Sequence, residues 1–290
     1  MKRSLAVLVI ASLLVSLAGC AVPAAGTAAP AQEAAEAVEE TAEAVEEAAE
    51  AAEEVSEAVE EAAEEAAEAV EEAAVMTHEE YMAAAIDDPV VIETYVQAKQ
   101  SWWDNKATLY TQAEDGAYFI YNAACSEEDY EKLTPGTKIR VNGFKAEWSG
   151  EIEIAEGAEL TILDGEEYIA PATDVTDLLG DEEGMLAHQN EFVAFKGMTV
   201  EAYGQNDDGE DQAFFYNWDG SGEEGNDLYF CVSKDGKKYN FTVESYLCDP
   251  STEVYQAVKE LKIGDVIDLE GFLYWYEGVN PHITKVTPAE

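Results

Sequence analysis

The residues with the most recognisable chemistry lie at the start of the chain and end at Cys20. Met1-Lys2-Arg3 is positively charged, residues 5–17 are apolar, and small residues directly precede the Cys20 thiol. This order is typical of a bacterial lipoprotein signal, in which the cysteine receives acyl chains such as palmitate. A secretory peptide with a chance cysteine is the alternative. We therefore expect residues 1–20 to be a signal peptide and Cys20 to anchor the protein to the membrane outside the cytoplasm.

A second kind of chemistry is ligand recognition by aromatic and polar side chains. Aromatic rings stack on the apolar faces of sugars, and nearby amides, hydroxyls and carboxylates bond the sugar hydroxyls. The candidate ligand-binding residues are Trp102, Trp103, Trp148, Trp218, Tyr274, Tyr276, Asn280 and His282. Core packing is the alternative for each ring. The adjacent pair Trp102-Trp103 must split between the two faces of a continuing strand, so one of these rings is expected to be exposed.

Oxygen-rich loops at residues 206–211 and 219–227 have ligands that suit Ca²⁺. Neither loop fits the twelve-residue calcium motif, because Phe230 occupies position 12 counted from Asp219, where a bidentate Glu is required. We expect solvated hairpin tips and no cofactor, with a bound calcium ion as the alternative. Transition metals are disfavoured because the histidines are far apart in sequence and Cys-x-x-Cys does not occur.

Motifs for catalysis are absent from the sequence. It contains neither Gly-x-Ser-x-Gly nor the phosphate-binding Gly-x-x-x-x-Gly-Lys. Acidic pairs are so frequent that their spacing says nothing about acid–base roles. We therefore interpret the chain as a binding or adaptor module and not as an enzyme. Cys125, Cys231 and Cys248 remain beyond Cys20, an odd number, and a bridge between Cys231 and Cys248 is left open.

Charge restricts the possible partners. The 290 residues include 15 Lys and Arg against 63 Asp and Glu, for a formal net charge of −48. Residues 31–75 hold 18 Glu and no basic residue, and residues 76–290 hold 45 acidic and 13 basic residues. Such a surface repels polyanions, which disfavours nucleic acid and anionic lipid head groups. After the leader, no apolar run approaches the roughly 20 residues of a membrane span, so membrane attachment depends on Cys20.

Residues 21–75 form a low-complexity spacer dominated by Ala and Glu. The pentapeptide Glu-Ala-Val-Glu-Glu recurs at 36–40, 43–47, 57–61 and 68–72. Ala and Glu favour helix, whereas eighteen like charges without a counter-charge favour an extended chain. A partly helical spacer and a disordered tail are both compatible with this composition.

The elements that position the candidate residues follow one order. A capping box at Thr77 predicts a short helix through Ala85. Strands are predicted at 90–103, 107–112 and 117–122, a helix from Ser126 to Leu133, and strands at 137–148 and 151–163. Three strands, a helix and two strands is the order of the OB-fold, a five-stranded barrel.

The same order recurs in the second half. Residues from Leu133 to Gly150 find matching residue types at an offset of 128, including Gly136 with Gly264 and Gly143-Phe144 with Gly271-Phe272. Strands are predicted at 191–203, 213–218, 228–233, 237–245 and 280–287, and a helix at 251–261. We expect a mostly β protein with tandem OB-like barrels at 76–163 and 190–290, joined by a linker at 164–189. Short helices at 77–85 and 185–189 each plug one barrel.

Stretches such as Tyr95–Asp104, Cys125–Gly136 and Gly271–Ile283 make the chain resemble bacterial extracytoplasmic lipoproteins with tandem OB-like domains. The resemblance implies fold and location but no reaction. OB-folds bind oligonucleotides or oligosaccharides over strands 2 and 3, between the 1–2 and 4–5 loops. The resulting expectation is a lipid-anchored protein that binds a neutral oligosaccharide or an envelope protein. A structural envelope spacer and an extracytoplasmic hydrolase are the alternatives.

Overall fold

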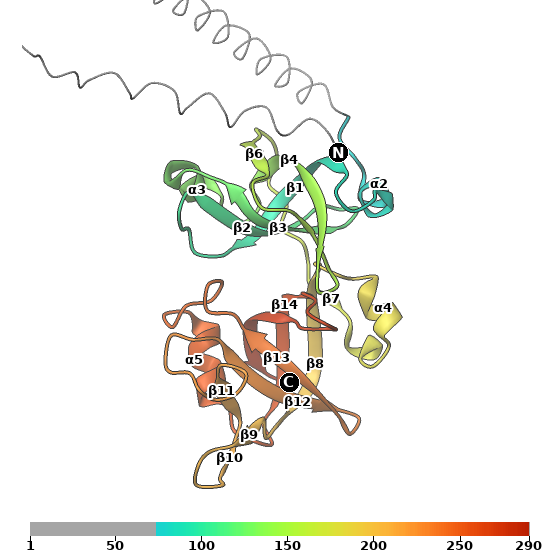
Figure 1. Cartoon of the computed structure of the whole chain (residues 1–290). Helices are drawn as coiled ribbons and strands as arrows, with labels where there is room; N and C mark the ends of the chain where they lie inside the picture. The colour runs from blue at the N-terminus through green and yellow to red at the C-terminus, as the bar shows by residue number, and fades with distance from the viewer. Residues whose placement is uncertain (1–73, 290) are drawn as a thin grey trace, which may run out of the picture. The chain divides into compact units, whose positions relative to one another are not determined.

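Two closed β-barrels follow one another in the part of the chain that the structure describes, residues 74–289 (Figure 1). This computed structural model confirms the predicted mostly β fold with tandem OB-like barrels. The predicted signal peptide, Cys20 and nearly all of the Ala/Glu spacer lie outside the described residues. Among the helices that are described, none has the length and apolar character needed to cross a membrane.

The first barrel closes through parallel and antiparallel pairings. Its strands are β1 (Pro89–Lys99), β2 (Lys106–Gln112), β3 (Ala117–Ala124), β4 (Lys138–Trp148), β5 (Glu151–Ile154) and β6 (Glu159–Ile162). β1 pairs antiparallel with β2 and β4, and β3 pairs parallel with β5 and β6. The predicted single strand at 151–163 is therefore split in two. Gly157, with φ of 86°, turns the chain between the halves.

Two helices accompany this barrel, α2 (His78–Ala83) and α3 (Glu127–Lys132). The predicted capping box is present, because Thr77 Oγ1 accepts a bond from Glu80 N and Glu80 Oε2 accepts one from Thr77 N. At the other end of α2, Lys145 Nζ of β4 donates to the carbonyls of Met82 and Ala84, both at 2.8 Å. These bonds hold the helix against the barrel while buried Tyr81 joins the core.

The second barrel has the same connectivity with a longer insertion. Its strands are β8 (Phe192–Glu201), β12 (Leu228–Lys234), β13 (Lys237–Val243), β14 (Val266–Phe272) and β15 (His282–Pro288). The other elements are β7 (Thr173–Asp174), the 3₁₀ helix η2 (Thr176–Leu178), α4 (Glu182–Leu186), β9 (Gly204–Gln205), β10 (Asp211–Gln212), β11 (Phe214–Tyr216) and α5 (Glu253–Glu260). β8 pairs antiparallel with β12 and β14, and β13 meets β15 in parallel, which closes the barrel.

The sequence repeat extends to backbone geometry. Gly136 and Gly264, 128 residues apart, have φ of 93° and 96°, and Ser149 and Glu277 have φ of 51° and 53°. Two matched turns in the left-handed region therefore occupy the same places in both barrels. A register shift between Glu270 and Gly271 in the β14–β15 ladder marks a bulge at the second of the matched Gly-Phe pairs.

Each barrel has its own apolar core. The first is centred on Ile92, Leu109, Ile120, Ile139 and Ile154, and the second on Phe195, Phe230, Phe241, Leu269 and Ile283. All of these side chains are almost completely buried. Cys125, Cys231 and Cys248 are buried and free, so the Cys231–Cys248 bridge does not form in this structure.

Candidate ligand-binding surface

The outer face of strands 2 and 3, where OB-folds bind their ligands, is covered in the first barrel. Tyr110 of β2 and Phe119 of β3 are only 1% and 3% exposed. Tyr110 stacks on Phe272 of the second barrel, with ring centroids 4.6 Å apart, and Phe119 meets Tyr274 edge-on at 5.2 Å. Because these rings form an apolar cluster that joins the two barrels, this face of the first barrel is occupied.

The tryptophans predicted for the first barrel differ in environment. Trp102 is half-buried and its Nε1 donates to the carbonyl of Cys125 at 3.0 Å, so it fastens the β1–β2 loop. Trp103 is 58% exposed, with Lys106 Nζ 5.2 Å from its ring centroid. Trp148 is exposed at the end of β4. One ring of the Trp102-Trp103 pair is exposed, as expected, but the strand predicted at 90–103 ends at Lys99, so the pair lies in the β1–β2 loop and not on the two faces of a strand.

The predicted residues after β14 lie largely at the junction of the barrels. His282 is buried and bonds the Tyr110 hydroxyl through Nδ1 at 2.6 Å, and it stacks on Tyr274 at 4.4 Å. Burial lowers the pKa of His282 to about 3, so its imidazole is neutral at ordinary pH. Tyr276 is half exposed. The junction thus uses His282 and Tyr274 for packing and leaves Tyr276 facing solvent.

The second barrel keeps a more open outer face on β12 and β13. Phe230 points into the core, so its neighbour Tyr229 points outward. Tyr229 is paired with Phe215 of β11 in the strand ladder. Burial and the nearby Asp227 raise the pKa of Tyr229 to about 12, which keeps its hydroxyl a donor. On β13, the ladder partner of Tyr229 is Thr242, whose Oγ1 donates to Oδ1 of the predicted residue Asn280 at 3.1 Å.

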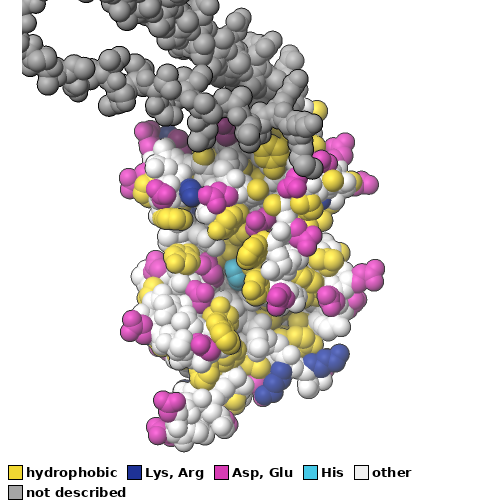
Figure 2. Space-filling view, viewed as in Figure 1, with side chains coloured by type: hydrophobic (Ala, Val, Ile, Leu, Met, Phe, Trp, Pro, Cys, Tyr) yellow, Lys and Arg dark blue, Asp and Glu magenta, His cyan; other side chains and the backbone are white. Residues whose placement is uncertain are grey.

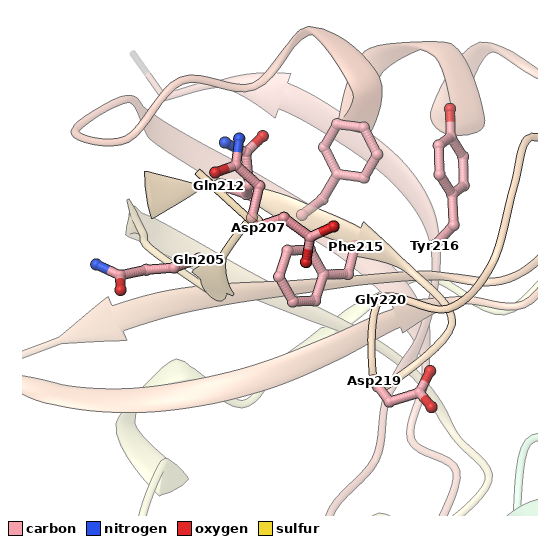
Figure 3. Close-up of a pocket in the computed structure, with 9 residues that line it drawn as sticks. Gln205, Asp207, Gln212, Phe215, Tyr216, Asp219 and Gly220 are labelled. Atoms are coloured by element: carbon pink, nitrogen blue, oxygen red, sulfur yellow. The ribbon is translucent and has the colours of Figure 1, made fainter. Parts of the chain in front are cut away.

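A hollow lies in the loop that joins β8 to β12, which corresponds to the 1–2 loop of an OB-fold. Its volume is about 340 Å³, within the range of small-ligand pockets. Figure 3 shows the residues that line it, which are Gln205, Asn206, Asp207, Gln212, Phe214, Phe215, Tyr216, Asp219 and Gly220. We call this hollow the β9–β11 pocket. Trp218, 71% exposed, lies in the same loop beside it.

Glycines fix the ring of Phe215 in this pocket. A Cβ at Gly204 would lie 2.7 Å from Phe215 Cε2, and one at Gly220 would lie 3.0 Å from Cδ2. Only residues without a side chain leave room for the ring at these two places. Tyr203 packs edge-on against the same ring at 5.4 Å, and its hydroxyl donates to the Trp218 carbonyl. Phe215 is thus closely packed between these two glycines and Tyr203, and it lines the pocket.

Polar groups surround the ring because side-chain bonds shape the two turns of the loop. Asn206 Oδ1 accepts from the backbone N–H groups of Asp208 and Glu210, which folds the β9–β10 hairpin. The bond from Ser221 to Asp219 folds the second turn and holds the pKa of Asp219 below its usual range. In Figure 3 the carboxylate of Asp207 lies beside the Phe215 ring, with the Gln212 amide nearby.

The surface around the barrels is acidic. On the face seen in Figure 2, acidic side chains are spread around clusters of hydrophobic ones, and Lys and Arg are few. Within residues 74–289 there is no group of three or more His, Cys, Asp or Glu side chains arranged to hold a metal ion. The pocket therefore offers an aromatic face, amides and carboxylate oxygens to a ligand, and little positive charge.

Sequence reasoning missed most of this pocket. Phe215, Asp207 and Gln212 lie in or beside segments interpreted as a strand and solvated hairpin tips. The available signal was the length of the insertion, since residues 202–227 separate β8 from β12 whereas residues 100–105 separate β1 from β2. A long loop with its own short strands is commonly functional.

No protein-family model matches the sequence, and no curated protein matches it either. Solved structures with a related arrangement include a murine DNA-binding protein bound to double-stranded DNA, at 12% identity and a TM-score of 0.33, covering 70% of this chain and 97% of that one. The Ifi202 HINa domain with 20-bp double-stranded DNA has 10% identity, a TM-score of 0.31 and coverages of 71% and 98%. A replication protein A heterotrimer bound to single-stranded DNA has 9% identity and a TM-score of 0.30, with coverages of 68% and 49%.

Proposed function

We propose that this protein is a lipid-anchored extracytoplasmic binding protein that recognises a neutral oligosaccharide through the β9–β11 pocket. The lipid is placed on Cys20, after the basic and apolar leader. The binding role rests on one observation, the fixed ring of Phe215 flanked by the Asp207 carboxylate and the Gln212 amide in the loop that OB-folds use for ligands.

The chemistry of the pocket favours an uncharged sugar. A sugar ring offers C–H groups to an aromatic face and hydroxyls to carboxylate and amide groups. The acidic residues of the loop repel phosphate and carboxylate groups, and the chain carries a formal net charge of −48. The pocket has no Lys or Arg among its lining residues, and binding of a nucleic acid requires such basic partners for its phosphates.

Glycan binding by the purified full chain tests the proposal. We expect Phe215→Ala to weaken retention of the best neutral glycan by roughly tenfold or more, since it removes the stacking surface. Phe144→Ala is the matched control, because Phe144 is a 58% exposed aromatic residue on the first barrel. Binding should be measured by isothermal titration, with single-stranded DNA as a second probe. Equal affinities of the two variants, or preferential binding of DNA, would contradict the proposal.

Anchoring is tested separately at Cys20. Growth with an alkyne-bearing fatty acid should label the wild-type protein, and Cys20→Ser should abolish labelling and release the protein from membranes. Cys231→Ser is the matched control, since Cys231 is a buried thiol of the second barrel. Labelling that persists in Cys20→Ser would show that the anchor is elsewhere.

We propose binding without catalysis, against the alternatives of a hydrolase and of an envelope spacer. The carboxyl groups with raised pKa values, Glu151, Glu153 and Glu244, are buried and lie outside the β9–β11 pocket. They therefore do not supply an acid–base pair to a sugar held there. Recovery of intact glycan after long incubation is expected, whereas shortened products would favour the hydrolase and failure of every glycan to bind would favour the spacer.

A further inference from the structure

The two barrels are joined by carboxyl groups that accept hydrogen bonds across their interface. Glu151 of β5 in the first barrel accepts a bond from the Trp275 backbone N–H of the second, at 2.8 Å. Glu244 of the second barrel accepts one from Gln100 Nε2 of the first, at 3.2 Å. Each barrel therefore contributes a buried acid that its partner contacts.

The surroundings of Glu151 show which form of the acid the interface accommodates. Its side chain is 0% exposed, and Oε2 accepts from Trp275 N and from Gln189 Nε2. Oε1 has no hydrogen-bond partner, and neither has Oδ1 of Asn190. The Asn190 amide lies near the same carboxyl and by itself lowers the pKa of Glu151, but burial outweighs it, and the Asn190 Nδ2 donates to the Ile152 carbonyl at 3.0 Å. Two buried oxygens of these side chains thus have no hydrogen-bond donor, and a proton on Glu151 would supply one.

We propose that protonated Glu151 is a proton-dependent latch that holds the two barrels together, with its O–H donated to Asn190 Oδ1. One proton satisfies both orphan oxygens and removes an uncompensated charge from the interface. Loss of that proton places a carboxylate against an acceptor and favours separation of the barrels. This latch is independent of the ligand that the β9–β11 pocket takes.

The other titratable groups at the interface act in the same direction or remain neutral. Burial raises the pKa of Glu151 to about 8, and those of Glu153 and Glu244 to about 7. His282 and the phenols of Tyr81, Tyr110 and Tyr274 stay neutral between pH 6.5 and 9, because burial lowers the pKa of the imidazole and raises those of the phenols. Lys145, 5.4 Å from the Tyr81 ring centroid, donates to the carbonyls that end α2.

The sign of the pH dependence follows from these values. In the open form the carboxyls face water and ionise with an ordinary pKa near 4.5, whereas in the closed form Glu151 keeps its proton up to about pH 8. The closed form therefore binds more protons, and closure weakens as pH rises. Between pH 7 and 8, Glu151 should raise the opening equilibrium constant about fivefold, and Glu153 and Glu244, which are half protonated at pH 7, should add about twofold each, for a total of roughly tenfold or more.

Hydrogen exchange of the full chain tests the latch at the Trp275 backbone N–H, which donates a hydrogen bond to Glu151. Exchange rates of the segment 273–277, divided by the intrinsic rate at each pH, should rise about tenfold from pH 7 to 8 in the wild type. Glu151→Gln keeps an acceptor for Trp275 and gives a permanent donor to Asn190, so its corrected rate should rise no more than about threefold, the share of Glu153 and Glu244. Glu147→Gln, at an exposed position on β4, should behave as the wild type. A tenfold rise in Glu151→Gln, or none in the wild type, would overturn the proposal.

A second measurement needs no variant to fold. In the wild type with ¹³C-labelled glutamate side chains, the Glu151 carboxyl resonance should titrate with a midpoint near pH 8. A Glu151 that is already ionised at pH 7 would refute the latch, whatever the variants do.

Discussion

The two barrels share one chain path but expose different surfaces. The first joins its initial two strands through residues 100–105, and its strand 2–3 face is covered by the second barrel. The second barrel inserts residues 202–227 at the same place and builds the β9–β11 pocket there. A repeat conserves the residues that close a barrel, while loops and outer faces are free to diverge. The first barrel thus uses its strand 2–3 face for packing, and the second barrel carries the candidate site.

The sharpest test of this difference is the matched pair Phe272 and Phe144, which follow matched glycines in the two repeats. Phe272 is 3% exposed in the junction, and Phe144 is 58% exposed. Phe272→Ala should lower the free energy of unfolding by about 3–5 kcal/mol, and Phe144→Ala should change it by less than about 0.5 kcal/mol. Urea unfolding followed by circular dichroism measures both. Similar losses in the two variants would mean that the barrels do not differ at this position.

A smaller effect is expected at the matched glycines that precede the fourth strand of each barrel. Gly136 and Gly264 both have φ in the left-handed region, so alanine should cost about 1–2 kcal/mol at either site. Gly136→Ala should cost more, because its Cβ would lie 3.1 Å from Glu167 Cβ, whereas Gly264 has open space. Thermal unfolding of the two variants checks the order. The reverse order would show that backbone strain differs between the repeats.

The smallest effect concerns an ion pair whose polarity is reversed between the barrels. In the first, Glu93 of β1 pairs with Arg140 of β4 at 2.9 Å, and in the second, Lys196 of β8 pairs with Asp268 of β14 at 3.6 Å. Bonds from Lys138 and Arg140 hold the pKa of Glu93 below its usual range. Glu93→Gln should therefore cost up to about 1 kcal/mol at pH 7, and this cost should shrink as pH falls below 4.5, the ordinary pKa of the carboxyl.

Lys196→Gln should cost less than Glu93→Gln, because Lys196 is 45% exposed and its pair is longer. Denaturant unfolding at pH 7 and pH 3.5 measures both variants. A larger loss at the Lys196 site would contradict the comparison.

Local patterns were enough to predict the elements of both barrels. The capping residues Thr77 and Ser126 begin the helices that the sequence predicts, and the matched glycines take matched backbone angles. These features depend on neighbouring residues, so a sequence carries them directly. The helix predicted at 185–189 instead spans Glu182–Leu186, because Asp181 caps it by accepting from Gly184 N.

Contacts between distant segments were not predictable in this way. Phe144 and Phe272 follow the same kind of glycine in the same repeat, yet one faces solvent and the other packs on Tyr110. Nothing in the local pattern distinguishes them, because the difference arises where two folded barrels meet. The environment of the Glu151 carboxyl is equally hidden from sequence, since the donors to its Oε2 come from residues about 40 and 120 positions away.

The covered outer face of β2 and β3 limits how the protein can be divided. Removing the second barrel would uncover Tyr110 and Phe119 together and leave an exposed hydrophobic patch on the remaining fragment. Residues 74–163 expressed alone should therefore self-associate and precipitate, although every strand of that barrel is present. Proteolytic clipping in the linker, followed by separation of the barrels, would carry the same hazard.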